Sequence, residues 1–327
     1  LLEFCMNVLI TGGAGSLGQA LARRLLDIGA ARVVVFSRDE YKHAVMREAM
    51  PDPRLRFFLG DVRDKDRLVL ALRGIETVIH AAALKRIDAL EYDPREAERT
   101  NVWGAMNVIE AAVTTSSVRK VLLISTDKAC APSSVYGASK LFAERLFAAA
   151  NSYSGAGGPI FAAVRYGNVA GSRGSVIPTW RAMVKADRTP VLTDPRMSRF
   201  WVRMPQAVDL VMLALDRMRG GEVYIPKLWS FWVADLWHAM CGSGEPHVMG
   251  RRPGEKLHES LISAHESPDA YDLGDVYCIC RPVAGEAEPR TMGQLVADGW
   301  EYCSGENDRW LDASALEAEI ERLEEAV

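Results

Sequence analysis

The sequence predicts a doubly wound α/β fold, in which a mostly parallel sheet carries helices on both faces. Short β-branched runs alternate with amphipathic stretches through the first half, a glycine-rich turn joins the first such pair, and 49% of the 327 residues are hydrophobic. Alternating strands and helices build a parallel sheet, and this length allows one large domain with a smaller second one. Ligands of such sheets bind beyond the carboxyl ends of the strands, where the strand order reverses.

Six apolar runs in the first half have the length and residue types of strands. They are Val8–Ile10, Arg32–Phe36, Leu55–Leu59, Thr77–His80, Lys120–Ser125 and Ile160–Arg165. Three long stretches between them have helical spacing, namely Ser16–Ile28, Pro94–Ala112 and Val135–Tyr153. Gly29 provides a stop for the first of these helices.

The second half is less regular. After about residue 168 repeated prolines divide the chain into short pieces, with helices expected at 205–217, 233–240 and 312–325. We therefore expect an NADP-binding Rossmann-type domain with the catalytic residues in 1–168. A smaller, irregular substrate-binding region in 169–327 could return a strand or a helix to it.

Composition disfavours several classes of protein. A formal charge of -4 and a pI near 6.0 argue against a nucleic-acid binder, which usually carries a concentrated basic face. No apolar run reaches the roughly 18 residues that a membrane span needs. A functional-looking loop already begins at Thr11, which disfavours a secretory signal, so we expect a cytoplasmic protein without a membrane partner.

The six cysteines do not form a metal motif. Cys278 and Cys280 are close in sequence, but the second pair that a zinc site would need is missing. Both lie in an alternating apolar run, residues 276–280, which favours a buried strand over a metal or redox site. We expect neither a disulfide framework nor a bound metal.

The glycine-rich turn, TGGAGSLG, predicts a dinucleotide site. Gly12 suits a tight turn, Gly15 lets a pyrophosphate approach the backbone, and Gly18 lets the helix pack closely on the strand. Ser16 and Leu17 open the helix, whose N-terminal N–H groups and dipole favour phosphate.

The end of the second strand favours NADP over NAD. An NAD enzyme usually presents an acidic residue there to hold the ribose hydroxyls. Ser37 occupies that place in this chain, and Arg38 and Lys42 can neutralise a 2′-phosphate. The alternative is that the two cations pair with Asp39 or with nearby carboxylates.

Two further loops are expected to line the cofactor site. Asp61 and Val62 follow the third strand, where the Asp side chain could accept a hydrogen bond from the adenine amino group. Ala81, Ala82 and Ala83 follow the fourth strand, and their small side chains leave room for a flat nucleotide. Ordinary close packing would also explain these alanines.

The candidate catalytic residues follow the fifth strand. Thr126, Asp127 and Lys128 lie at its end, and Tyr136 and Lys140 follow with a spacing of four, which puts them on one helix face. A tyrosine ionises near pH ~10. A lysine ammonium and a nicotinamide ring nearby would lower that pKa and make the phenolate a usable base.

Ten segments occur in an order typical of extended short-chain dehydrogenases: TGGAGSLG, SRDE, GDVRD, HAAALK, STDKA, YGASK, RYGNV, GSRGSV, MSRFW and RPGEKLHE. Together they resemble the soluble UDP-N-acetylglucosamine 4,6-dehydratases that invert carbon 5 and open the route to pseudaminic acid. The resemblance runs from about Met6 to Glu259. STDKA combined with RPGEKLHE is specific to that group, whereas many nucleotide-sugar enzymes share the other segments.

The resemblance implies roles for these residues. Tyr136 would deprotonate the C4 hydroxyl as NADP accepts hydride, and hydride would later return to C6. Lys128 would remove the C5 proton, provided that burial or nearby positive charge lowers its pKa. Asp127, held protonated, would assist departure of the C6 hydroxyl. Retaining relatives often carry Asp-Glu at this pair, and membrane-anchored relatives often have methionine at the tyrosine position. The alternative for Asp127 and Lys128 is a loop ion pair.

The resemblance also implies a substrate site and an assembly. Arg252 would bind the diphosphate of a UDP-sugar and Glu255 its ribose or uracil side, with Lys85, Asn168 and Arg199 as further candidates, although each could instead be a surface residue. A homo-oligomer, dimeric or higher, is expected from the helices around Asn101 and Tyr136.

The chain departs from the family at a few positions, and these leave the sugar and the C5 outcome open. Arg86 stands where histidine is usual, Cys130 replaces a small residue, and Ser133 and Ser134 replace bulkier or amide residues. A retaining dehydratase or an epimerase of a UDP-sugar is the nearest alternative. A non-catalytic NADP-sensing protein is more remote, because such proteins tend to lose the tyrosine–lysine pair.

Overall fold

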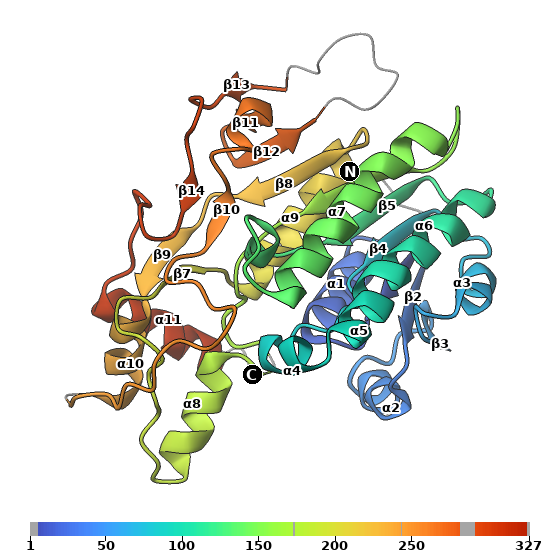
Figure 1. Cartoon of the computed structure of the whole chain (residues 1–327). Coiled ribbons are helices and arrows are strands. Elements are labelled where there is room, and N and C mark those ends of the chain that lie inside the picture. The colour runs from blue at the N-terminus through green and yellow to red at the C-terminus, as the bar shows by residue number, and fades with distance from the viewer. Residues whose placement is uncertain (1–5, 173, 243, 282–291, 326–327) are drawn as a thin grey trace.

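The computed structural model describes residues 6–172, 174–242, 244–281 and 292–325. Its centre is a ten-stranded sheet in the order β13-β11-β12-β8-β6-β5-β4-β1-β2-β3 (Figure 1). All six predicted strands are confirmed; they are β1 (Asn7–Thr11), β2 (Arg32–Ser37), β3 (Leu55–Leu59), β4 (Thr77–His80), β5 (Lys120–Ile124) and β6 (Ile160–Val164). They are parallel, and the strand order reverses between β1 and β4. The predicted doubly wound fold is therefore confirmed.

The chain beyond residue 168 adds four strands to this sheet. Strand β8 (Glu222–Pro226) runs parallel to β6, and β12 (Val276–Cys280) pairs antiparallel with β8. Strands β11 (Ala270–Asp272) and β13 (Gln294–Leu295) complete that edge. Cys278 and Cys280 are buried in β12, as the alternating apolar run predicted.

Helices cover both faces of the sheet. Helices α3 (Lys65–Ala71), α6 (Gly104–Thr114) and α7 (Val135–Tyr153) pack side by side in one layer, and α1 (Ser16–Asp27) packs against α9 (Met204–Arg217) in the other. Three shorter helices, α2 (Glu40–Ala49), α4 (Ile87–Tyr92) and α5 (Pro94–Ala97), lie along the loops. In the described residues, no helix combines the length and the apolar character needed to cross a membrane.

The predicted helix at 94–112 differs from the observed one. Between α5 and α6 the chain forms a π-helical turn, Glu98–Trp103, which widens the helix locally. It presents the buried Asn101, whose side chain bonds the backbone N–H and carbonyl of Leu84 at 2.8 and 2.9 Å. The turn thus fixes the loop that follows β4.

The remaining elements form a second apolar core, beside the large sheet in Figure 1. They are α8 (Val176–Lys185), β7 (Ser198–Trp201), β9 (Trp229–Trp232), α10 (Val233–Cys241) and α11 (Ala313–Glu325). A short ladder joins β10 (Ser260–Ile262) and β14 (Tyr302–Cys303), and β10 contacts the turn Asp127–Ala129 that follows β5. Residues from both parts of the chain thus meet near the carboxyl end of β5.

Candidate active site

The glycine-rich turn is built for close approach of backbones. Gly12 has a φ of +67°, and a Cβ atom there would lie 2.8 Å from the backbone nitrogen of Ala82. A Cβ on Gly18 would lie 2.5 Å from the Cα of Gly13, so α1 packs directly on the turn. Helix α1 begins at Ser16, and its first N–H groups have no intrahelical acceptor. The turn therefore offers a narrow, donor-rich edge.

The alanine loop lies against this turn. The N–H of Ala82 donates to Thr11 Oγ1 at 3.2 Å, and the same hydroxyl bonds His80 Nδ1 at 2.7 Å. Ala81, Ala82 and Ala83 are all partly exposed. The carboxyl ends of β1 and β4 thus form one cradle with small side chains, which fits a dinucleotide.

The cations after β2 already have carboxylate partners. Lys42 pairs with Asp39 at 2.6 Å, which is the alternative that the sequence left open, and Arg38 lies 3.6 Å from Asp61. Arg38 remains half exposed at the rim. Ser37 Oγ bonds His43 Nε2 at 2.7 Å.

Asp61 and Val62 lie at the end of β3. Asp61 accepts from Arg63 Nη2 at 2.7 Å, so an adenine amino group would have to share this carboxylate. Val62 is buried, and a Cβ on Gly104 would lie 2.8 Å from its Cγ2. Val62 therefore fixes the start of α6 beside this loop.

The predicted catalytic residues come together at the end of β5. Thr126 caps the 3₁₀ turn Asp127–Ala129 and donates to Asp127 Oδ1 at 2.8 Å. Tyr136, at the start of α7, is buried and bonds Thr126. Lys140, one turn further along α7, donates to the Ile124 carbonyl at 2.7 Å. Burial lowers the pKa of Lys140 to about 8.

The expected lowering of the Tyr136 pKa does not occur in the protein itself. Burial raises this pKa, although the positive charge of Lys128 and the bond with Thr126 oppose the change. The Lys140 ammonium donates to a carbonyl, so it is held by β5. The protein's own groups therefore keep the phenol protonated at neutral pH.

The lowered pKa that a base role for Lys128 requires is likewise not found in the protein itself. Burial opposes the charged form, but the carboxylates of Asp127 and Glu259 outweigh both burial and the charge of Arg199, and the Lys128 pKa is raised. Lys128 Nζ lies 3.1 Å from Asp127 Oδ1 and 3.4 Å from Glu259 Oε1. The ion pair named above as the alternative is thus present. It is part of a buried cluster, and its two charges also act on the pKa of Tyr136.

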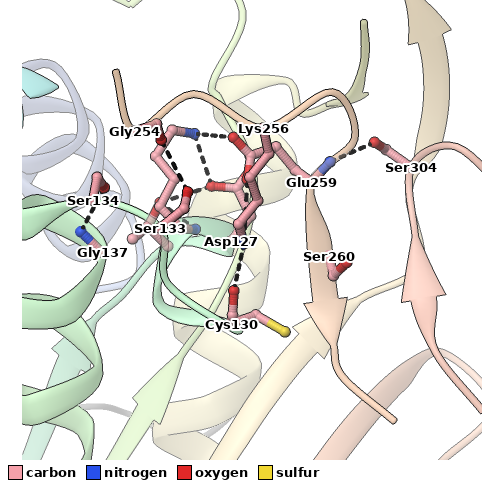
Figure 2. A network of polar contacts seen from close by, with 12 residues as sticks. Asp127, Cys130, Ser133, Ser134, Gly137, Gly254, Lys256, Glu259, Ser260 and Ser304 are labelled. Atoms are coloured by element: carbon pink, nitrogen blue, oxygen red, sulfur yellow. Dashed lines mark hydrogen bonds and ion pairs between the residues drawn. The ribbon is translucent and has the colours of Figure 1, made fainter. Parts of the chain in front are cut away.

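Sequence reasoning missed Glu259. It is the last residue of RPGEKLHE, and membership of that segment is its only sequence signal. The structure buries it beside Lys128. Figure 2 shows the adjoining segment, in which Lys256 Nζ donates to the Cys130 carbonyl at 2.6 Å and Ser133 Oγ to the Gly254 carbonyl at 3.0 Å. The segment 254–259 is thus hydrogen-bonded to the loop around the turn Asp127–Ala129, the candidate catalytic turn.

The substrate-site candidates are unevenly placed. Arg252 is exposed, and its backbone N–H donates to Glu255 Oε2 at 3.1 Å. Asn168 accepts from Lys128 Nζ at 3.1 Å and is otherwise exposed. Lys85 is exposed beyond the alanine loop. The guanidinium of Arg199 donates to the backbone carbonyls of residues 198, 256 and 257, so it supports the 254–259 segment from below.

A buried charge network lies behind the catalytic turn, and sequence reasoning missed it too. Arg165 is fully buried and bonds Glu144 Oε2 at 2.5 Å and Glu266 Oε2 at 2.9 Å. Ser125 donates to Glu144, and the Cys130 thiol contacts Glu266 at 3.5 Å. The network therefore links β6, α7 and the C-terminal part to both ends of the catalytic turn.

Comparisons with known proteins agree with this arrangement. A family described as polysaccharide biosynthesis protein matches residues 8–281. The inverting UDP-N-acetylglucosamine 4,6-dehydratase of Campylobacter jejuni is 40% identical to this chain, and the matched region covers 95% of this chain and 96% of the dehydratase. A UDP-glucose 4-epimerase of Rickettsia felis is 41% identical over 84% of this chain and 82% of its own.

Solved structures extend the likeness to the whole fold. Pen from Bacillus thuringiensis superposes with a TM-score of 0.90 at 34% identity and covers 98% of each chain. The dTDP-glucose 4,6-dehydratase DesIV from Streptomyces venezuelae, solved with NAD and TYD bound, gives a TM-score of 0.70 at 26% identity. It covers 77% of this chain and 87% of its own.

Proposed function

This chain belongs to the family of polysaccharide biosynthesis proteins, and we propose that it removes water from UDP-N-acetylglucosamine across C5 and C6, with inversion at C5. The product is a UDP-4-keto-6-deoxy-N-acetylhexosamine. The observation that carries the proposal is the buried cluster of Tyr136, Asp127 and Lys128 at the carboxyl end of β5. Three groups of this kind would supply the three proton transfers that the reaction needs.

NADP is the proposed cofactor. The glycine turn and the alanine loop fit a dinucleotide, because a side chain at Gly12 would fill their narrowest point. A nicotinamide bound there would accept hydride from C4 and return it to C6. DesIV carries NAD, whereas Ser37 and the half-exposed Arg38 favour the 2′-phosphate of NADP in this chain.

The chain's own residues divide the proton transfers. Tyr136 would accept the proton of the C4 hydroxyl as a phenolate, a form that the positive charge of a nicotinamide bound beside it would favour, and the resulting ketone acidifies C5–H. Lys128, once it has released a proton to solvent, takes the C5 proton, and Asp127, once it has taken up a proton, donates that proton to the C6 hydroxyl, which leaves as water. Arg252 and Glu255 on the exposed rim are the groups that we assign to the UDP moiety.

Incubation with UDP-N-acetylglucosamine and NADP tests this function. We expect a product that is one water lighter by mass spectrometry. Absorbance should show no net build-up of reduced cofactor. Proton NMR then reports the C5 configuration: retention indicates a retaining dehydratase, and an unchanged mass with a new C4 configuration indicates an epimerase. Unaltered substrate contradicts the proposal.

Arg38 carries the cofactor preference. We expect Arg38→Ala to weaken NADP binding by about 10- to 100-fold, since a charge-assisted hydrogen bond contributes about 1.5–3 kcal/mol. Binding of NAD should change little, and calorimetric titration measures both. Arg24→Ala serves as the control, because Arg24 is half exposed on α1 and pairs with Asp209 at 3.9 Å. Equal loss for both cofactors contradicts the role.

A homo-oligomer remains part of the proposal. Large apolar side chains are exposed along α4, the π-helical turn and α7, with Tyr92 at 93%, Trp103 at 51% and Phe142 at 54% exposure. Exposed aromatic side chains of this kind are typical of protein interfaces. A second copy of the chain is the occupant that we propose for this face.

A further inference from the structure

The Lys128 ammonium is surrounded by oxygen atoms. Asp127 Oδ1 and Asn168 Oδ1 each accept from Nζ at 3.1 Å, and Glu259 Oε1 lies 3.4 Å away. An ammonium has three protons to donate. The three oxygens therefore match the charged form of Lys128 and leave no lone pair to attack a C–H bond.

Glu259 is the one of these partners that comes from the C-terminal part of the chain. Its side chain is only 3% exposed, and its backbone N–H donates to Ser304 Oγ at 2.9 Å (Figure 2). Lys256 Nζ and Arg199 Nε each lie 4.0 Å from its carboxylate. Two further cations thus face the buried Glu259 carboxylate beside Lys128.

One carboxylate oxygen of Glu259 and one of Asp127 lack a hydrogen-bond partner among the described residues. Both Glu259 Oε2 and Asp127 Oδ2 are buried. A buried acceptor without a partner is energetically costly, and at a functional site it indicates a position where a bound molecule can donate a hydrogen bond. Lys128 therefore lies between two carboxylates that still have accepting capacity.

We propose that Glu259 is a positioning residue that holds Lys128 as an ammonium ion and so sets the pH above which Lys128 becomes a base. The inference rests on the proposed function, because Lys128 needs a neutral amine only if it takes a proton from carbon. The other charged or titratable groups that face Lys128 are Asp127 on the 3₁₀ turn, Arg199 on β7 and Tyr136 on α7. None of them comes from the 254–259 segment, so Glu259 is the charged group through which that segment contacts Lys128.

The test titrates Lys128 in the full-length protein, whether or not it turns over substrate. Lysines carrying ¹³C at Cε are followed by NMR against pH, and the Lys128 resonance is assigned by its loss in Lys128→Arg. In Glu259→Gln we expect the Lys128 midpoint to fall by about one unit or more, since an opposite charge within 4–6 Å shifts a pKa by about 1–3 units. Glu259→Asp keeps the charge and should restore a midpoint near that of the wild type.

Asp272→Asn is the matched control, because it removes the carboxylate 2.7 Å from Lys227 at a site remote from the catalytic turn. It should leave the Lys128 midpoint unchanged. A Glu259→Gln midpoint equal to or above the wild-type value overturns the proposal, as does a resonance that fails to titrate in both proteins. A lowered midpoint in a protein that leaves UDP-N-acetylglucosamine unaltered upholds this inference and rejects the proposed dehydration instead.

If the proposed function also holds, a second readout moves in the same direction. Deuterium exchange at C5 in D₂O should reach its alkaline plateau at lower pH in Glu259→Gln than in the wild type. A purely structural role would lower the plateau at every pH without moving its midpoint, and that pattern counts against the proposal.

Discussion

Replacing Lys128 with alanine is expected to stop dehydration while leaving oxidation at C4 in place. Removal of a general base costs about 10²- to 10⁴-fold in rate, and in the described part of the chain Lys128 is the cation that pairs with Asp127. Loss of C5 exchange into D₂O, measured by NMR, reports the base directly. A transient rise of reduced-nicotinamide absorbance reports the C4 step.

Two further variants separate charge from base function. Lys128→Arg keeps a cation beside Asp127 and Glu259 but cannot lose its proton at accessible pH, so it should resemble the alanine variant. Lys65→Ala removes a half-exposed lysine that pairs with Glu110 at 2.9 Å, and it should exchange C5 at the wild-type rate. Unchanged C5 exchange in Lys128→Ala removes Lys128 from the mechanism and leaves the base to another group.

The direction of the pKa shifts gives this reaction a pH dependence. The Lys128 pKa is raised, so the neutral amine becomes more abundant as pH increases. The Lys140 pKa of about 8 works in the opposite sense, since the ammonium beside β5 loses its charge above that pH. C5 exchange should therefore rise from neutral to mildly alkaline pH. A fall in that range would indicate that the charge of Lys140 supports Tyr136.

Local patterns were sufficient to predict the first half of the fold. The strands β1 to β6 are runs of β-branched and apolar residues, and α7 spans the predicted Val135–Tyr153, with Ser134 capping its N-terminus. The π-helical turn at Glu98–Trp103 was not predicted, since one extra residue in a turn hardly changes an apolar period. Strands β8 and β12 join the sheet through pairings distant in sequence, which no local pattern specifies.

The charge state of the site was the least predictable part. The residues Asp127, Lys128 and Tyr136 were recognisable from spacing and resemblance, and the structure gathers them. The pKa of Lys128, however, depends on Glu259 and Arg199, which lie in distant segments and meet it only in the folded chain. Sequence reasoning considered burial and nearby positive charge, whereas the carboxylates of Asp127 and Glu259 outweigh both.

Arg165→Met is expected to cause the largest loss of stability. The guanidinium is fully buried and makes five hydrogen bonds, to Glu144, Glu266 and the Leu261 carbonyl. Removing one partner of a buried ion pair costs about 3–5 kcal/mol, because it leaves uncompensated buried charge. The free energy of unfolding in urea should fall by this amount, and the melting temperature should fall with it.

Two comparisons identify the origin of that loss. Arg217→Met breaks a half-exposed pair with Asp275 at 2.9 Å and should cost less than about 1 kcal/mol. The triple variant Arg165→Met, Glu144→Leu, Glu266→Leu removes Arg165 together with both of its carboxylate partners and should recover part of the lost stability, as apolar replacements of buried ion networks often do. If the triple variant is less stable than Arg165→Met, uncompensated charge is not the cause. Because Ser125 and Cys130 hold the catalytic turn to Glu144 and Glu266, the triple variant should regain stability without regaining the dehydration rate.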